Sequence, residues 1–465
     1  MKIEKDSVSG IRIAYIGGGS RGWAWGLMSD LVSCGDISGD VYLYDIDQEA
    51  ADKNEIIGNM YNSVEGAKSR WNYHSVHSAA EALTGADFVV ISILPGTFDE
   101  MESDVHEPEK YGIYQSVGDT SGPGGIIRAM RTVPMFEEIA ENIKKYAPNA
   151  WVINYTNPMT LCTKTLYRVF PEIKAFGCCH EVFGTQKFLA LVVKEALGLE
   201  EDIPRSDIKI NVVGVNHFTW LTKASWRHVD IFPLYREYCK KYPDGKPFDG
   251  PVDKNWMNNS FASNEKVKME LFMRYGCIAA AGDRHLSEFC EGKWYLENPE
   301  RVAEMHFGLT PVSWRKKNLE KLLNRRADIL SGVRPLAIKP TGEDGVNQIR
   351  ALLGLNDFVT NVNIPNVGQI PDLPLGAVVE TNARFCSDSV TPVMAGKLPK
   401  TIYPLIARVC GQQEALDQAI AARDLEAIFA VFVNDPLVTC SMKDARKLFD
   451  AMCSNTKKYL GSYGL

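Results

Sequence analysis

The sequence lacks a C-x-x-C pair, a strongly basic segment and any apolar run long enough to cross a membrane. Its 11 cysteines are an odd number spread over 465 residues, which matches neither a disulfide scaffold nor a paired-cysteine zinc ribbon. The formal net charge of −7 argues against nucleic acid or an anionic membrane as the main partner. The apolar run near the N-terminus is too short for a signal peptide. We therefore expect a cytoplasmic protein with reduced thiols that acts on a small molecule.

The residues that are present predict a large globular core, since 45% are hydrophobic and 23% charged. Through the first 200 residues, short apolar runs alternate with helical patterns, which predicts an α/β fold with a Rossmann-type, doubly wound, mostly parallel sheet. After residue 200 the loops lengthen and helical patterns dominate. We expect two domains, 1–200 and 201–465 (the second α+β), packed with a cleft between them. The predicted strands are 11–16, 41–44, 88–94, 151–154, 173–177 and 208–215.

A glycine-rich turn follows the first predicted strand and opens a helix predicted at 23–32. Gly17, Gly19 and Gly22 fit G-x-G-x-x-G, in which the glycines permit a tight turn, close approach of a pyrophosphate and close helix packing. Asp45 lies 23 residues after Gly22, near the spacing of an acid that binds an adenosine ribose. The alternative is a purely structural turn. The complete order favours dinucleotide binding, and Asp45 with no adjacent Arg favours NAD+ over NADP+. The predicted cofactor site also includes Ser20, Arg21 and Gly96.

A second glycine cluster occupies residues 116–131 and precedes another predicted helix. Gly122, Gly124 and Gly125 are typical of a loop that cradles the nicotinamide end of a cofactor or a sugar. A flexible turn around Pro123 is the alternative.

Polar side chains follow two of the predicted strands. Cys178, Cys179, His180 and Glu181 come directly after the strand at 173–177, and Asn216–His217 after the strand that ends at 215. The carboxyl ends of strands in an open α/β sheet are where ligands bind. Thiolate and imidazole bind divalent transition metals, although a structural role is the alternative for a Cys-His pair.

Two further polar clusters are candidates for proton transfer or sugar binding. One is Asn154–Asn157, where a strand ends before a proline, and the other runs from Asp283 to Glu288. The second cluster is equally typical of a charged helix start.

Eight segments carry a resemblance to a known family: IAYIGGGSRGW, ISILPG, GDTSGPGGIIRAMRTVP, INYTNPM, CCHEVFG, VVGVNHFTW, GDRHLSEF and NVNIPNVGQIPDLP. In this order they resemble glycoside hydrolase family 4, the NAD- and metal-dependent glycosidases that depart from the usual two-carboxylate scheme. The tetrapeptide CHEV at residues 179–182 is similar to that of the α-galacturonidase subgroup, which acts on pectin-derived oligosaccharides.

The resemblance implies a redox-neutral cycle of oxidation, elimination, addition and reduction. NAD+ oxidises C3 of the sugar, a base removes the C2 proton as the glycosidic bond breaks, water adds, and the hydride returns. A divalent metal, usually Mn2+ in this family and here with Cys179 and His217 as the implied ligands, polarises the sugar oxygens. Homodimers or homotetramers are usual in the family.

Further roles follow from the same resemblance. Other family branches place a Tyr or an Asp as the base in this stretch. This sequence has no Tyr there, so we predict Asp283 as the base, with His285 as the second choice. His180 is the candidate acid for the leaving oxygen. The predicted substrate-binding residues are Asn157, Asn216, Glu181 and Arg284, the last as a bidentate partner for the uronate carboxylate.

Several alternatives remain at this point. The substrate is an α-glucuronide, an α-galactoside or an α-glucoside instead of an α-galacturonide, or the protein is an ordinary NAD-dependent hydroxy acid dehydrogenase or a catalytically silent NAD-binding sensor. Ten cysteines are expected to be small hydrophobic residues. The remaining one, Cys179, is the candidate ligand whose oxidation would silence the enzyme.

Overall fold

The computed structural model describes residues 1–247 and 261–465 and contains a ten-stranded sheet, here called sheet A. Its strands lie in the order β14-β13-β12-β7-β6-β5-β2-β3-β4, with β1 (Lys2–Ile3) paired to β2. The strands from β4 to β7 pair in parallel. The predicted doubly wound α/β fold is confirmed. These strands are β2 (Val8–Ile16), β3 (Ile37–Tyr44), β4 (Trp71–Ser75), β5 (Phe88–Ile91), β6 (Trp151–Asn154) and β7 (Lys174–Gly177).

Helices cover both faces of sheet A, which explains the continuous apolar runs in its strands. In β2, Ile13 and Tyr15 pack with α1 (Trp23–Val32) and α14 (Gly345–Leu352) on one face. Ala14 and Ile16 pack on the other face, in a cluster with residues of α3 (Ala79–Leu83), α5 (Gly122–Tyr146) and α6 (Met159–Val169). Successive side chains of a strand point to opposite faces, so each apolar residue is buried. A further covering helix is α2 (Gln48–Met60).

The local predictions agree closely with the structure. The predicted helix at 23–32 is α1 and the predicted strand at 151–154 is β6, with the same bounds. The strand predicted at 88–94 is shorter and ends at Ile91. There the chain turns toward the next loop, because the Ile93 N–H donates to Thr156 Oγ1 at 3.0 Å.

The second half of the chain extends sheet A and builds a smaller one. Strands β12 (Phe358–Pro365), β13 (Val378–Cys386) and β14 (Ser389–Pro392) join the β7 edge with antiparallel pairing. Sheet A therefore takes strands from both sides of residue 200, where the predicted domain boundary stays a prediction. The smaller sheet, sheet B, contains β8 (Ile208–Val215), β9 (Phe218–Trp226), β10 (Val229–Asp230) and β11 (Ile278–Ala279).

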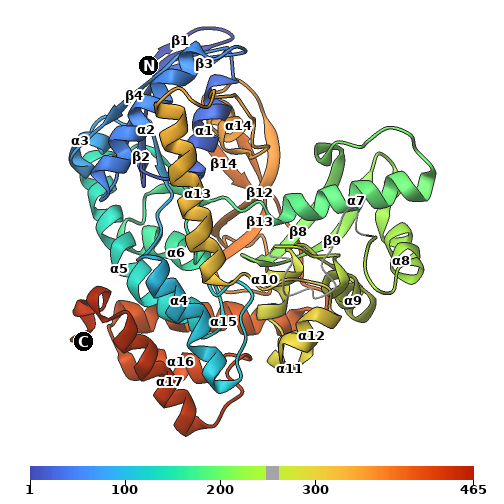
Figure 1. Ribbon diagram of the computed structural model, residues 1–465. Coiled ribbons are helices and arrows are strands. Elements are labelled where there is room, and N and C mark those ends of the chain that lie inside the picture. The colour runs from blue at the N-terminus through green and yellow to red at the C-terminus, as the bar shows by residue number, and fades with distance from the viewer. Residues whose placement is uncertain (248–260) are drawn as a thin grey trace.

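Helices of the second half surround sheet B and close the lower side of the molecule. In Figure 1, α7, α8 and α9 extend to the right with sheet B, while α15, α16 and α17 lie at the lower left, where α15 and α16 pack against α5 and α17 packs against α4 and α5. No helix in the described part of the chain is long and apolar enough to cross a membrane. The bounds are α4 (Phe98–His106), α7 (Glu181–Leu197), α8 (Ile231–Lys241), α9 (Lys266–Tyr275), α10 (Asp283–Glu288), α11 (Gly292–Tyr295), α12 (Pro299–Glu304), α13 (Val312–Leu330), α15 (Tyr403–Ala421), α16 (Leu425–Val433) and α17 (Met442–Asn455).

Candidate active site

The glycine-rich turn joins β2 to α1 at the carboxyl edge of sheet A. Gly17 has φ +93°, and a Cβ there would lie 2.0 Å from the Ser92 carbonyl oxygen, so only glycine fits. The Gly19 N–H donates to Asp45 Oδ2 at 2.8 Å. The Asp47 N–H donates to the other oxygen, Oδ1, at 2.9 Å. Asp45 thus closes the turn, in addition to its predicted role at a ribose.

The other predicted cofactor residues lie around the same turn, with one correction. Ser20 Oγ accepts from the Trp23 N–H at 3.2 Å, and Arg21 pairs with Asp47 at 3.0 Å. The close helix packing predicted for Gly22 is wrong, because a Cβ there would meet no atom within 4 Å. Gly96 has φ +92° in the loop between β5 and α4.

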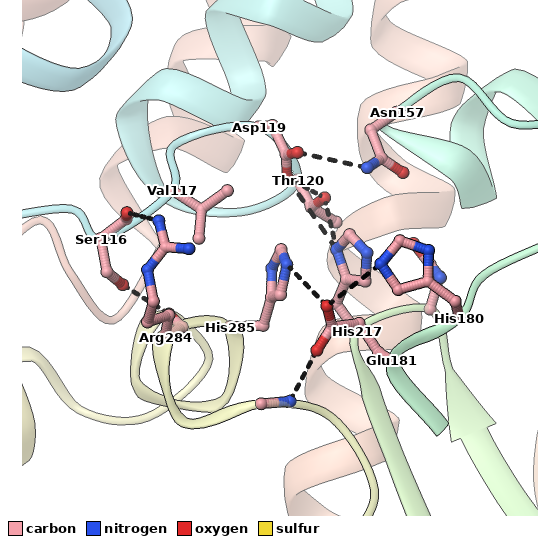
Figure 2. Close-up of polar contacts among 12 residues, drawn as sticks. Ser116, Val117, Asp119, Thr120, Asn157, His180, Glu181, His217, Arg284 and His285 are labelled. Carbon is pink, nitrogen blue, oxygen red and sulfur yellow. Dashed lines mark hydrogen bonds and ion pairs between the residues drawn. The ribbon is translucent and has the colours of Figure 1, made fainter. Parts of the chain in front are cut away.

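A cluster of ionisable side chains lies beside the carboxyl edge of sheet A and is shown in Figure 2. Asp119, His217 and His285 each offer one ligand atom, and these atoms lie within 4.8 Å of one another. They come from the loop before α5, the β8–β9 turn and α10. We refer to these three residues as the His-Asp cluster. A carboxylate and two imidazoles suit a divalent transition metal.

His217 is buried and held in one orientation. Its Nδ1 lies 2.9 Å from Thr120 Oγ1, and its ring stacks on that of His285 with 3.8 Å between centroids. Burial and the neighbouring His285 lower the pKa of His217 to about 3. A neutral imidazole whose Nδ1 is fixed by a hydrogen bond presents Nε2 as a metal ligand.

Glu181 joins the cluster to the CHEV segment. One oxygen, Oε1, lies 3.7 Å from His285 Nε2 and 4.0 Å from His180 Nε2, and Oε2 accepts from the Gly282 N–H at 2.7 Å. His180 Nδ1 lies 3.2 Å from Glu343 Oε1, and this contact raises the His180 pKa. The His180 ring also stacks on Trp23, at 5.7 Å between centroids.

Cys179 lies next to the cluster but is not one of its three members. The Asn216 side chain is within hydrogen-bonding reach of its thiol, and burial together with the Glu380 and Glu181 carboxylates raises the pKa of that thiol. A bound divalent cation reverses this preference, since coordination deprotonates a thiol. All 11 cysteines are free. The adjacent Cys178 donates to Gln348 Oε1 at 3.0 Å.

Asp283 does not fit its predicted role as the proton-accepting base. The side chain is fully buried, and its oxygens accept from the Val267 and Lys268 N–H groups at 3.1 and 3.0 Å and from Ser263 Oγ at 2.9 Å. It therefore anchors the first turn of α9. His285, two residues further on, is the member of this segment that faces the cluster.

Arg284 does not present the predicted bidentate fork. Its Nε donates to the Gly308 carbonyl at 3.1 Å, and Nη2 donates to the Ser116 carbonyl at 2.8 Å and to Thr310 Oγ1. The side chain thus braces the loop that carries Asp119, and among its contacts with the described residues only Nη1 remains for a ligand.

Two asparagines at the site have amide oxygens available for a ligand. Asn157 Nδ2 donates to Asp119 Oδ2 at 3.2 Å. The Oδ1 atoms of Asn157 and Asn216, and His285 Nδ1, are buried with no hydrogen-bond partner among the described residues. Because buried polar atoms normally have partners, these three atoms indicate a ligand-binding space.

Several site residues were not predicted from the sequence. Asp119 and Thr120 lie in the second glycine cluster, where the glycines give the stronger signal. Those glycines serve packing, since a Cβ at Gly124 would lie 2.6 Å from the Asp104 carbonyl. Glu343 and Glu380 carry no local signal, because they reach the site only through tertiary contacts.

Comparisons with known proteins agree with this geometry. The family models for family 4 glycosyl hydrolase and for its C-terminal domain match residues 12–195 and 212–438. The chain is similar to the alpha-galacturonidases of Thermoanaerobacterium saccharolyticum, at 58% identity over 100% of this chain and 99% of the relative, and of Bacillus subtilis, at 52% over 95% and 96%.

Solved structures share the fold along nearly the whole chain. A Bacillus subtilis protein described as a glucosidase has a TM-score of 0.90 at 51% identity, covering 96% of this chain and 100% of the other. A 6-phospho-alpha-glucosidase from gut microorganisms, solved with NAD and Mn2+, has a TM-score of 0.77 at 18% identity, covering 97% and 99%. The chain therefore belongs to glycosyl hydrolase family 4.

Proposed function

We propose that this enzyme hydrolyses α-linked galacturonides with the help of bound NAD+ and a divalent cation such as Mn2+. The observation that carries the proposal is the junction of two sites. Trp23, the first residue of α1, follows the glycine-rich turn, and its ring stacks on His180 of the CHEV segment. The full-length relatives named alpha-galacturonidase support the substrate class.

The residues fit both groups. The glycine-rich turn leads into the N-terminus of α1, where the first N–H groups of a helix would hold a pyrophosphate. Cys179 and His217, the predicted ligands, together with Asp119, provide sulfur, nitrogen and oxygen donors for a cation. The buried Oδ1 atom of Asn216, which has no hydrogen-bond partner in the described part of the chain, adds an acceptor beside them.

Bound NAD+ would supply a reversible hydride acceptor for C3 of the sugar, and a bound cation would supply Lewis-acid polarisation of the C3 oxygen. His285 is the group that removes the C2 proton, because its Nδ1 is unpartnered among the described residues. Glu181, 3.7 Å from Nε2, stabilises the imidazolium that results. His180, paired with Glu343, protonates the leaving oxygen.

Neutral side chains bind the hydroxyl groups of the sugar, and charged side chains bind its carboxylate. The amide oxygens of Asn157 and Asn216 accept from hydroxyl groups. Arg284 offers Nη1 to the uronate carboxylate. Arg315 is a second cation for it, since both guanidinium groups lie over the Phe261 ring, at 4.5 and 5.5 Å from its centroid.

The test is hydrolysis of p-nitrophenyl α-D-galacturonide with NAD+, Mn2+ and a reductant. We expect solvent deuterium at C2 of the product, no net NADH, and little activity on the matching α-glucuronide and α-galactoside. Activity that survives complete removal of NAD+ and metal would sink the proposal. Stoichiometric NADH from a hydroxy acid would instead indicate a dehydrogenase.

Two predictions from the resemblance concern the whole protein. The protein should form a homodimer or homotetramer, and light scattering coupled to gel filtration measures its mass. A cytoplasmic location is measured by cell fractionation.

A further inference from the structure

A buried carboxylate lies behind the predicted metal ligands. Glu380 on β13 is 1% exposed. Its Oε1 accepts from Asn361 Nδ2 at 2.7 Å, and its Oε2 accepts from Asn216 Nδ2 at 3.2 Å. The strand register places Asn363 of β12 directly opposite Glu380. Among the described residues, the side chains that donate to this carboxylate are therefore neutral amides.

The same asparagines reach the two segments that carry Cys179 and His217. Asn361 Nδ2 also donates to the Cys179 carbonyl oxygen at 3.2 Å. Asn216 lies within reach of the Cys179 thiol and directly precedes His217. One carboxylate thus links the loop before α7 to the β8–β9 turn.

Burying the Glu380 carboxylate costs free energy of folding, which indicates that the residue has a function. A buried carboxylate without a cationic partner loses hydration that amide donors only partly replace. The hydrogen bonds from Asn216 and Asn361 stabilise the charged form of Glu380 and offset only part of this cost. An apolar side chain would fill the same place between β12 and the β8–β9 turn at lower cost.

The carboxylate also sets which way the Asn216 amide points. With Nδ2 donating to Glu380, the Oδ1 atom is directed elsewhere, and it is buried with no partner among the described residues. A carboxylate only accepts, whereas an amide in its place both accepts and donates. Glu380 therefore fixes Asn216 Oδ1 as an acceptor facing the ligand space.

We propose that Glu380 is a positioning residue that holds Cys179, Asn216 and His217 in the arrangement that binds the divalent cation. It acts through the asparagines and does not touch substrate. The inference rests on the proposed function, since it assumes that these residues bind the cation.

The test is the affinity of the Glu380→Gln variant for Mn2+, measured on metal-free protein by the electron paramagnetic resonance signal of free Mn2+. We expect binding weaker by about 10- to 100-fold, the usual effect of removing a group that orients a metal ligand. The affinity for NAD+, measured by calorimetry, should change by less than about 2-fold. At saturating Mn2+, kcat should recover toward the wild-type value.

The matched control is Asp417→Asn, which alters another buried carboxylate, one paired with Arg168 on α6 at 3.3 Å. This variant should bind Mn2+ like the wild type. If Glu380→Gln does not fold, Asn361→Ser carries the same prediction, because it removes the link to the Cys179 carbonyl and leaves the Asn216 contact.

The outcomes separate the two proposals. Wild-type affinity for Mn2+ in the folded Glu380→Gln or Asn361→Ser variant overturns the positioning role of Glu380. A wild-type protein that binds no Mn2+ overturns the proposed function itself. Equal weakening of Mn2+ and NAD+ binding would indicate general damage to the fold and also overturns the inference.

Discussion

The glycine-rich turn and the His-Asp cluster differ in how the chain builds them. The turn comes from one continuous segment after β2, with Asp45 from the next strand closing it through Gly19. The cluster takes one residue each from three segments, at Asp119, His217 and His285. The turn depends on backbone conformation, whereas the cluster depends on how sheets A and B and α10 pack together.

This difference has a consequence for mutation. A change in the turn acts on the backbone itself, so it affects the cofactor and little else. A change in the cluster removes a metal-binding or proton-accepting atom and leaves the turn itself unchanged. The two sites should therefore be separable by single substitutions, even though Trp23 and His180 join them.

The largest expected effect is the loss of catalysis in Cys179→Ser. Losing a thiolate ligand removes several kcal/mol of cation-dependent stabilisation, which is roughly 10³-fold in kcat/KM. NAD+ affinity should stay within about 2-fold. Cys178→Ser is the matched control, since that thiol contacts Gln348 instead, and it should retain activity. Loss of NAD+ binding in folded Cys179→Ser would contradict separable sites.

The second effect distinguishes His285 from Asp283. His285→Ala should lower kcat by roughly 10²- to 10³-fold, the usual contribution of a general base, with loss of deuterium exchange at C2. Asp283→Asn should instead lower the melting temperature, because it weakens the anchoring of α9 at Val267 and Lys268. An Asp283→Asn enzyme that is fully stable but inactive would reverse the assignment.

A smaller effect is expected in the turn. In Gly19→Ala, the new Cβ would lie 2.8 Å from Ala50 Cβ and 2.9 Å from Asp45 Oδ2. Overpacking of this kind costs about 1–3 kcal/mol, so NAD+ affinity should fall by about 10- to 100-fold while Mn2+ affinity persists. Gly35→Ala is the control, since its Cβ would make an ordinary 3.5 Å contact with Lys68. Unchanged calorimetric NAD+ binding in Gly19→Ala would remove the turn from the cofactor site.

The smallest effect concerns Asp435, which accepts from the Gly122 N–H at 3.1 Å at the start of α5. Burial raises its pKa to about 6. The folded state therefore binds this proton more tightly, and the stability that results is lost as pH rises from about 4 through 6. The melting temperature of Asp435→Asn relative to wild type should rise by roughly 2 °C between pH 4.5 and 7.5. A pH-independent difference contradicts this.

Much of the fold was predictable because its signals are local. A continuous apolar run such as Phe88–Ile91, in which every residue is buried, indicates a strand covered on both faces. The glycines at 17 and 19 indicate a tight turn that a larger residue would not fit. The addition of β12 to the β7 edge has no such signal. It depends on pairing between residues as distant as Asn363 and Gly177.

The site was predictable in part for the same reason. Cys179 and His217 attracted attention because each follows a strand, where ligands bind, and the family resemblance implied them as metal ligands. His217 lies in the His-Asp cluster, and Cys179 lies beside it. Asp283 was preferred to His285 on residue type, and only the α9 contacts show that its oxygens are engaged elsewhere. Arg284 likewise has the right chemistry, but its donors are used by backbone carbonyls.

The sequence by itself determined the parallel core of sheet A, the glycine-rich turn and the family to which the chain belongs. Only the tertiary structure decided that Asp119 completes the cluster with His217 and His285, and that Glu380 lies behind Cys179. The physical reason is how far apart the interacting residues lie along the chain. Backbone conformation and burial leave a periodic or residue-specific trace along the chain, whereas side-chain contacts between distant segments leave none until the sheets pack.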